Sequence, residues 1–306
     1  MRFWFLLSLA LGSFFSVALP QVSQGSLQRL ENFPSKLVPA RHIDIWLPAG
    51  FNPAKKYAVL YMHDGQMLYD ASSNWNKQEW QVDETAQALM NSGKVRPFIV
   101  VGVHNADLNR HAEYFPQRPF QSLPAQTQQD FYQLDRQPGQ KLFQRPVYSD
   151  AYLKFLVTEL KPYIDNHFPV FTDRANTFIM GSSMGGLISM YAISEYPQVF
   201  GGAGCLSTHW PGIFPDKENP VPDAFLSYMQ QKLPKPAEHK LYFDYGDQTL
   251  DAFYPPLQKQ VDQLMQQLQY PPALWQSRFF PGAEHSEQAW AKRLDIPLQF
   301  LLTPQP

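Results

Sequence analysis

The sequence predicts an α/β fold with a mostly parallel central sheet and helices on both faces. Two observations lead to this prediction. Strand-like and helix-like segments alternate along most of the chain, an order typical of parallel sheets whose connections are helices. The 306 residues are also 44 % hydrophobic and only 17 % charged, which allows a large core and excludes a disordered chain. We expect a single domain over residues 19–306.

Short β-branched or aromatic runs, each ended by Gly, Pro, Asp or His, mark the strands. They lie at residues 42–47, 57–62, 97–103, 177–180, 202–206, 240–245 and 274–280. Between them, apolar side chains recur every three or four positions, which predicts helices. These helices lie at residues 152–167, 185–195, 256–268 and 287–302.

One long connection breaks this alternation. Residues 105–148 are rich in Gln and Pro and have little periodicity, yet they contain aromatic side chains such as Tyr114 and Phe120. Connections of this length are usually functional or mobile. We therefore expect an insert after an early strand that caps a site without forming a separate domain.

The first 18 residues are predicted to be a secretory signal peptide. Arg2 supplies a positive charge, an apolar run follows it, and Ser16-Val17-Ala18 provides the small residues that a signal peptidase reads. We expect cleavage near Ala18, a periplasmic or secreted protein, and no stable membrane insertion after processing. A transmembrane anchor is the alternative, although the run is slightly short for a span of about 20 residues.

Charge and cysteine content narrow the function classes. The net charge is −2, with 25 Lys and Arg against 27 Asp and Glu, so the chain as a whole does not attract nucleic acid. Cys205 is the single cysteine, which excludes an intramolecular disulfide and a cysteine-rich metal site. We expect no nucleic-acid partner and no cofactor, and the sequence does not indicate the oligomeric state.

The segment 181–185 reads Gly-Ser-Ser-Met-Gly, a G-x-S-x-G motif. It follows the predicted strand 177–180 and precedes a predicted helix, the context that a nucleophile elbow requires. Gly181 and Gly185 flank Ser183 because the turn packs helix against strand too closely for a Cβ atom. The start of the helix also favours negative charge. Ser183 is therefore the predicted nucleophile.

A serine hydroxyl needs a base, and the base needs an acceptor that fixes its tautomer. His285 lies in a polar loop between the last predicted strand and the last predicted helix. In the α/β-hydrolase fold, the catalytic base comes from a loop at this position. The loop after strand 240–245 offers three carboxylates as the acid. We rank Asp251 first and Asp247 second, while Asp244 still belongs to the strand pattern. The order Ser183, Asp251, His285 is that of the α/β-hydrolase fold.

Acyl transfer also needs two hydrogen-bond donors for the developing oxyanion. The backbone N–H of Met184 is one candidate, and that of Gln66, in the loop after strand 57–62, is the other. His63 and Asp64 in the same loop could instead be metal ligands. The sequence contains no further ligand cluster and no H-E-x-x-H helix, so we expect no metal.

Five strings together resemble the bacterial family of putative esterases, an esterase-D-like branch of the α/β-hydrolases that includes siderophore (enterochelin), feruloyl and acetylxylan esterases. They are AVLYMHDGQ (58–66), GSSMGG (181–186), YFDYG (242–246), TLD (249–251) and AEHSE (283–287). The resemblance implies a metal-free serine hydrolase with Ser183 as nucleophile and His285 as base. It also implies an oxyanion hole from the amides after Ser183 and after Asp64-Gly65. Some siderophore esterases use a serine–histidine dyad, so a dyad remains an alternative.

The leading interpretation is an exported carboxylic-ester hydrolase for a small-molecule or saccharide ester, such as a siderophore or an acylated carbohydrate. Arg110 is the candidate clamp for a substrate carboxylate or catecholate, and Trp210 the candidate stacking partner for a ring. A local ion pair and a core position would explain these two residues equally well. An acyltransferase of the same fold and a binding protein on a degenerate hydrolase scaffold are the alternative functions.

Overall fold

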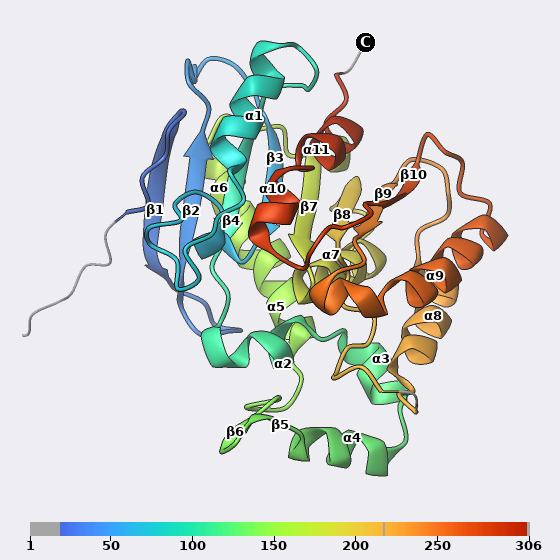
Figure 1. Cartoon of the computed structure of the whole chain (residues 1–306). Helices are drawn as coiled ribbons and strands as arrows, with labels where there is room; N and C mark the ends of the chain where they lie inside the picture. Colours follow the sequence, from blue (N-terminus) through green and yellow to red (C-terminus); the bar gives the residue numbers. More distant parts are fainter. Residues whose placement is uncertain (1–18, 217, 305–306) are drawn as a thin grey trace, which may run out of the picture.

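The computed structural model describes residues 19–216 and 218–304 and contains the predicted mostly parallel sheet (Figure 1). In this part of the chain, eight strands form one sheet in the order β1-β2-β4-β3-β7-β8-β9-β10. The six strands from β4 to β10 are parallel, whereas β2 pairs antiparallel with both β4 and the edge strand β1. The strands are β1 (Ser26–Phe33), β2 (Arg41–Leu47), β3 (Ala58–His63), β4 (Phe98–Val103), β7 (Thr177–Ser182), β8 (Gly202–Leu206), β9 (Lys240–Tyr245) and β10 (Trp275–Phe279).

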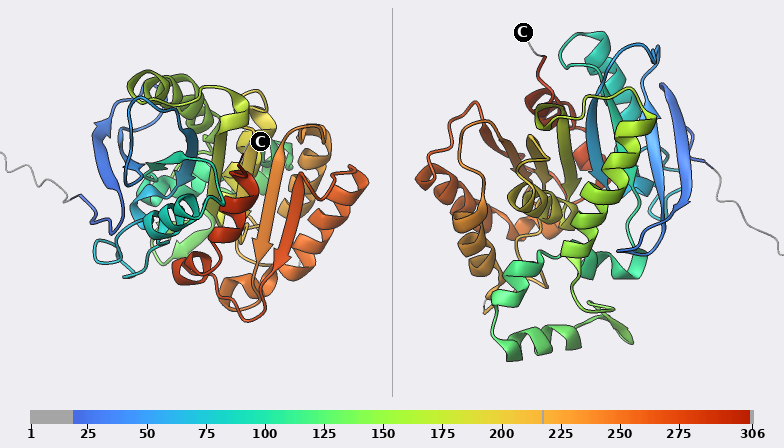
Figure 2. Two further views of the ribbon diagram at one scale, coloured as in Figure 1. Left: turned by 90° about the horizontal axis from the view of Figure 1, so that it is seen from above. Right: turned by 180° about the vertical axis from the view of Figure 1, so that it is seen from behind.

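Helices cover both faces of the sheet (Figure 2). The α-helices are α1 (Val82–Asn91), α2 (Arg110–Tyr114), α3 (Gln117–Ser122), α4 (Ala125–Gln133), α5 (Ser149–Phe155), α6 (Lys161–His167), α7 (Met184–Glu195), α8 (Val221–Lys232), α9 (Pro255–Gln267), α10 (Glu287–Ala291) and α11 (Asp295–Leu301). Shorter turns are η1 (Gly65–Met67), η2 (Asp107–Asn109), the π-helical η3 (Leu156–Leu160), η4 (Arg174–Asn176) and η5 (Thr249–Phe253).

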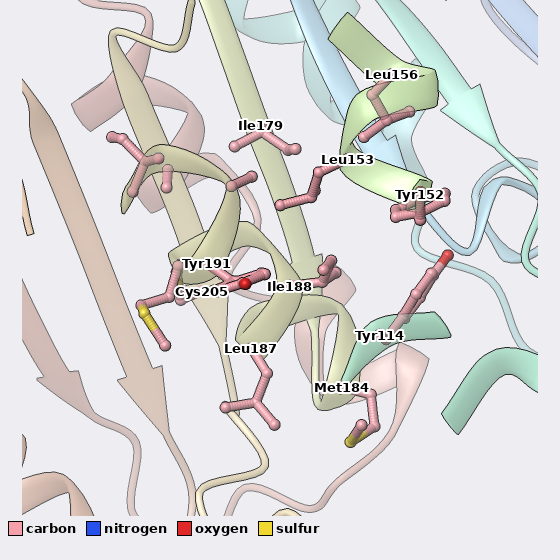
Figure 3. Close-up of a cluster of buried hydrophobic side chains, with 14 of the residues drawn as sticks. Tyr114, Tyr152, Leu153, Leu156, Ile179, Met184, Leu187, Ile188, Tyr191 and Cys205 are labelled. Atoms are coloured by element: carbon pink, nitrogen blue, oxygen red, sulfur yellow. The ribbon is translucent and has the colours of Figure 1, made fainter. Parts of the chain in front are cut away.

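Two hydrophobic clusters correspond to the two faces of the sheet. Alternate residues of a strand point to opposite faces, so Val59 and Tyr61 belong to one cluster and Leu60 and Met62 to the other. The first cluster packs against α5 to α9, and the second against α1, α10 and α11. Helix α7 lies in the first cluster and is buried along almost its whole length (Figure 3). The predicted fold class is confirmed.

Several elements differ from the predictions, and helices α1 and α8 were not predicted. The helix expected at 287–302 is divided into α10 and α11, because Pro297 in the first turn of α11 cannot donate to a preceding carbonyl and clashes with it. The helix expected at 152–167 starts at Ser149 and contains the π turn η3. Strand β1 was not predicted, because it is a half-exposed edge strand with mostly polar residues.

The insert 105–148 contains η2, α2, α3, α4 and a two-stranded ribbon of β5 (Asp135–Gln137) and β6 (Gln140–Lys141). Its side chains Phe115, Phe120 and Phe143 belong to the first hydrophobic cluster. The buried residues Arg41 in β2 and Glu113 in α2 form a bidentate ion pair with distances of 2.7 and 2.6 Å. This ion pair therefore anchors the insert to the sheet, close to the end of β4.

The predicted signal peptide lies outside the described residues. Within residues 19–216 and 218–304, no helix is long and apolar enough to cross a membrane.

Candidate active site

Ser183 occupies the turn between β7 and α7 with φ 58° and ψ −123°. A Cβ atom on Gly181 would lie 2.9 Å from the carbonyl carbon of Gly185, and one on Gly186 would lie 2.9 Å from Thr208 Oγ1. Each of these contacts is too close for a side chain. The glycines therefore allow strand and helix to meet at the serine, whose positive φ is uncommon for a residue other than glycine.

Two backbone hydrogen bonds anchor this elbow. The Ser183 N–H donates to Leu206 O at 2.9 Å, and the His209 N–H donates to Ser183 O at 3.2 Å. The strained conformation of Ser183 is thus held from β8 and from the loop that follows it.

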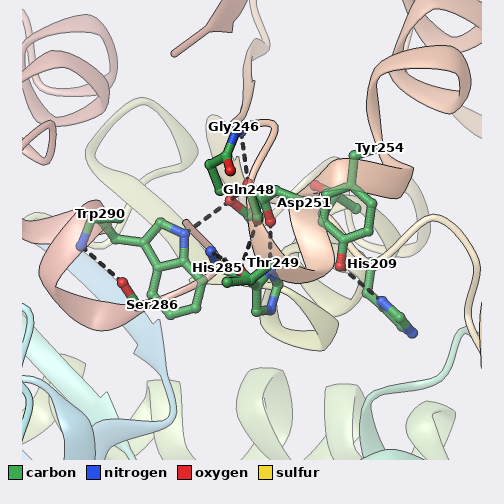
Figure 4. Close-up of polar contacts among 12 residues, drawn as sticks. His209, Gly246, Gln248, Thr249, Asp251, Tyr254, His285, Ser286 and Trp290 are labelled. Atoms are coloured by element: carbon green, nitrogen blue, oxygen red, sulfur yellow. Dashed lines mark hydrogen bonds and ion pairs between the residues drawn. The ribbon is translucent and has the colours of Figure 1, made fainter. Parts of the chain in front are cut away.

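Asp251 and His285 are in direct contact. Asp251 Oδ1 lies 2.6 Å from His285 Nδ1, and the carboxylate is fully buried. Its other oxygen, Oδ2, accepts hydrogen bonds from Ser207 Oγ at 2.6 Å and from the Gly246 N–H at 2.7 Å (Figure 4). These donors fix the carboxylate and leave Oδ1 for the imidazole.

The other two candidate acids have different partners. Asp247 Oδ1 accepts hydrogen bonds from the Gly282 N–H at 2.7 Å and from Gln248 Nε2 at 3.0 Å. Asp244 is buried against Arg293, with 2.9 Å from Oδ1 to Nη2. Burial raises the pKa of Asp244, and Arg293 opposes that effect. Of the three carboxylates in this loop, the one in contact with His285 is Asp251.

Aromatic rings and a backbone contact hold His285 on its remaining sides. The rings of Trp290 and Tyr254 pack edge to face with the imidazole, with centroids 5.0 and 5.7 Å away. The backbone N–H of His285 donates to Thr249 Oγ1 at 2.9 Å. The side chain is only 14 % exposed, so its orientation is restricted.

Tyr254 connects His285 to a second histidine that the sequence analysis did not assign to the site. Tyr254 Oη lies 2.9 Å from His209 Nδ1, and His209 Nε2 lies 3.0 Å from Ile213 O. Burial lowers the pKa of His209 to about 3, so the ring is neutral. Because a carbonyl can only accept, Nε2 carries the proton and Tyr254 donates to Nδ1.

The two candidate oxyanion donors come from neighbouring turns. Met184 is the first residue of α7, and Gln66 lies in η1. Asp64 Oδ2 lies 3.3 Å from the position of a Cβ on Gly185, so the loop before η1 packs directly against the start of α7. Ser183, His285 and Gln66 all line one cleft of about 580 Å³.

Arg110 lines the same cleft but is already engaged. Its Nε and Nη2 donate to the two oxygens of Asp64 at 2.6 and 2.7 Å, and its guanidinium lies over the ring of Tyr114. Burial lowers the pKa of Arg110, but the contacts with Asp64 outweigh burial and leave the pKa above its ordinary value. Arg110 thus forms a local ion pair, which the sequence analysis gave as the alternative to substrate binding by this residue.

Trp210 does not line the cleft. Its side chain is 2 % exposed, packs on Phe243 and donates Nε1–H to Gln258 at 2.7 Å. A substrate ring cannot reach its face. The prediction that Trp210 stacks on substrate is wrong, because this tryptophan after a strand is a core residue.

His63 and Asp64, the candidates for metal ligation, have other partners. His63 Nδ1 lies 2.8 Å from Tyr152 Oη, and burial lowers the pKa of His63 to about 3. Asp64 binds Arg110. Within the described part of the chain, no group of three or more His, Cys, Asp or Glu residues is arranged to hold a metal ion.

A model of the family described as "Putative esterase" matches residues 36–301. The chain belongs to the Putative esterase family. This confirms the family that the sequence strings predicted.

Curated relatives of this esterase-family chain are distant. The uncharacterized protein YjcH of Bacillus subtilis is 21 % identical over 178 residues, which cover 58 % of this chain and 59 % of the relative. The endo-1,4-beta-xylanase/feruloyl esterase of Xylanibacter ruminicola is 25 % identical over 197 residues, which cover 61 % of this chain and 22 % of the relative. The matches thus span less than two thirds of these relatives.

Solved structures support the fold of this esterase-family chain over nearly its whole length. A ferulic acid esterase from Anaeromyces mucronatus in complex with ferulic acid has a TM-score of 0.62 at 19 % identity, covering 92 % of both chains. An IroE-like serine hydrolase from Shewanella oneidensis has a TM-score of 0.62 at 18 % identity, covering 90 % of this chain and 78 % of the other. The enterobactin esterase of Shigella flexneri has a TM-score of 0.62 at 17 % identity, and the match covers 92 % of this chain and 60 % of the other.

Several residues that line the cleft of this family member were not predicted from the sequence. Among them are Trp75, Leu108, Arg136 and Glu287. Trp75 and Leu108 are 87 % and 55 % exposed. An isolated aromatic residue in the polar stretch 70–78 is the one signal that could have drawn attention to Trp75. Arg136 lies in β5 of the two-stranded ribbon in the insert. No local sequence pattern indicates that this ribbon lies beside the cleft.

Proposed function

We propose that this protein is an exported hydrolase of carboxylic esters, with Ser183 as nucleophile, His285 as general base and Asp251 as the acid that orients it. The observation that carries the proposal is the 2.6 Å hydrogen bond between the buried Asp251 and His285, which lines the same cleft as Ser183. Asp251 accepts from Nδ1–H, which leaves Nε2 as the basic nitrogen.

The reaction proceeds through an acyl-enzyme. Ser183 Oγ attacks the ester carbonyl carbon while His285 Nε2 takes the hydroxyl proton, and the Met184 and Gln66 N–H groups donate to the oxyanion. The bond to the alcohol oxygen then breaks, and His285 returns the proton to that oxygen. Water next attacks the acyl carbon while His285 Nε2 takes a proton from it. The bond between the acyl carbon and Ser183 Oγ then breaks, His285 returns the proton to Ser183 Oγ, and the carboxylic acid leaves.

For the substrate, we propose an ester of the size found in siderophores or acylated carbohydrates. A cleft of about 580 Å³ is within the range of about 300–1,000 Å³ typical of small-molecule sites. The similar structures include an esterase in complex with ferulic acid and an enterobactin esterase. Export to the periplasm or the medium rests on the apolar N-terminal segment with its small residues at 16–18.

The test combines active-site labelling with an ester screen. A fluorophosphonate should add mass at Ser183, and Ser183→Ala should abolish both labelling and hydrolysis while the protein stays folded. p-Nitrophenyl esters of increasing length, a feruloyl ester, an acetylated sugar and a trilactone siderophore would define the substrate. Labelling at Ser182 would contradict the assignment of the nucleophile.

Two alternatives give different results in the same assays. An acyltransferase would form a new ester when alcohols or sugars are added, at the expense of the free acid. A binding protein on this scaffold would neither be labelled nor release acid. Membrane-bound, full-length chain in the native host would contradict export of a processed protein.

A further inference from the structure

Trp75 is unusual among the tryptophans of this structure because its side chain is 87 % exposed. The tryptophans with 4 % exposure or less are Trp46, Trp80, Trp210 and Trp290. A single exposed apolar side chain is ordinary on a protein surface, but one at the rim of a functional cleft is a candidate contact for a ligand. Trp75 lines the cleft that contains Ser183 and His285, together with Leu108, which is 55 % exposed.

The turn that carries Trp75 is well fixed. Asp70 Oδ1 accepts hydrogen bonds from the N–H and the hydroxyl of Ser72 at 2.9 and 2.6 Å. The amide of Asn74, whose side chain is buried, donates to Gln78 O at 2.6 Å across the turn. These hydrogen bonds on both sides of Trp75 fix the turn that holds the indole at the rim of the cleft.

Further contacts connect this turn to the helix after His285. Asn76 Nδ2 donates to Glu287 Oε2 at 2.8 Å, and the Gln288 N–H donates to Gln78 Oε1 at 3.3 Å. Glu287 and Gln288 form the start of α10, directly after the His285 loop. Trp75 thus stands on the side of the cleft that His285 occupies.

This placement indicates which part of an ester Trp75 would meet. In the proposed mechanism, His285 returns its proton to the alcohol oxygen, so the alcohol part of the ester lies on the His285 side of the cleft. A flat ring face is the group that packs best on an exposed indole. We propose that Trp75 is the substrate-binding residue for the alcohol part of the ester and packs on a ring there. This inference rests on the proposed ester hydrolysis.

Three esters of one acid test it, with the acid chosen as the best acyl group for the wild-type protein. Their alcohols are methanol, naphthylmethanol and glucose acylated at its primary hydroxyl, and release of the common acid is followed by pH-stat. Trp75→Ala should raise KM about tenfold or more for at least one ring-bearing ester. It should leave the methyl ester within about twofold, and Trp75→Phe should recover part of the loss.

Phe171→Ala is the matched control, because Phe171 is an exposed aromatic residue that does not line the cleft. It should leave all three esters unchanged. If Trp75→Ala raises KM for the naphthylmethyl ester, an aryl ring is the preferred partner of Trp75. If it raises KM for the glucose ester, a sugar ring is the partner. An equal increase in KM for all three esters in Trp75→Ala, or no increase for either ring-bearing ester, would overturn the proposal.

Fluorescence separates this inference from the catalytic proposal. In Ser183→Ala protein, binding of a ring-bearing ester should protect Trp75 from acrylamide quenching, and the protected component should be absent from the double variant with Trp75→Phe. Quenching that is unchanged at saturating ester would refute the contact. If the wild-type protein hydrolyses no ester at all, the proposed function fails, whereas the quenching result still decides whether Trp75 binds these compounds.

Discussion

Ser207 Oγ lies 2.6 Å from Asp251 Oδ2, the carboxylate oxygen that His285 does not contact. The same hydroxyl accepts hydrogen bonds from Trp290 Nε1 and Arg293 Nη2, both at 2.9 Å. A hydroxyl has one proton and two acceptor sites. Since both acceptor sites are occupied, the proton of Ser207 must point to Asp251, whose Oδ2 accepts it.

Ser207→Ala should therefore reduce both stability and activity. The substitution leaves the buried Trp290 and Arg293 donors without this acceptor, which costs about 1–3 kcal/mol. Loss of one donor to Asp251 should also loosen His285 and lower kcat by about tenfold. Thermal unfolding and steady-state kinetics measure the two effects. Wild-type kcat in a folded variant would show that Gly246 alone is enough to orient the carboxylate.

Ser183→Gly should be inactive yet more stable than Ser183→Ala. At φ 58° and ψ −123°, a residue with a Cβ carries strain of about 1–3 kcal/mol, which glycine does not. We expect the melting temperature of Ser183→Gly to exceed that of Ser183→Ala by about 2 °C or more. Differential scanning calorimetry of both variants tests this, and equal melting temperatures would mean that the elbow is not strained.

The parts of the fold and site that the sequence predicted have causes within a short segment. Gly181 is needed because a Cβ atom there would meet the backbone of Gly185 at the start of the helix, so the motif indicated the elbow. The choice among Asp244, Asp247 and Asp251 depends on donors from other elements, such as Ser207 and Arg293, which no local pattern reveals. For this reason the sequence could rank the three carboxylates but could not decide among them.

The incorrect and missing predictions have the same origin. A tryptophan after a strand has the same local sequence whether it faces a cleft or the core, and contact with Gln258 in α9 makes Trp210 a core residue. Trp75 lies in a turn whose direction is set by hydrogen bonds to α10. Both outcomes depend on contacts between distant segments of the chain.

Glu79→Gln should stabilise the protein at neutral and alkaline pH but not in acid. Burial and the neighbouring carboxylates Glu84, Asp83 and Asp70 raise the pKa of Glu79 to about 7. With a raised pKa, the folded state binds more protons than the unfolded state between the two pKa values, so stability falls as pH rises through that window. For Glu79 this window extends from about pH 4.5 to about pH 7.

The melting temperatures of wild type and Glu79→Gln should therefore agree near pH 4 and diverge as pH rises to about 8. Glu31→Gln, at an exposed position in β1, is the control for removal of one negative charge. A constant difference between Glu79→Gln and wild type across this range would mean that Glu79 does not titrate with a raised pKa.

Asp251→Asn and Asp247→Asn should differ strongly in their effect on catalysis. Asp251 contacts His285 Nδ1 and stabilises the imidazolium that forms as Ser183 attacks, so Asp251→Asn should lower kcat by about 10²–10⁴ with little change in KM. Asp247 instead accepts the Gly282 N–H, an interaction that an asparagine oxygen can retain, so Asp247→Asn should cost less than about threefold. Steady-state kinetics on one ester compares the two, with circular dichroism to verify folding. The reverse pattern would move the acid to Asp247, and a loss below about tenfold in both would mean that Ser183 and His285 act as a dyad.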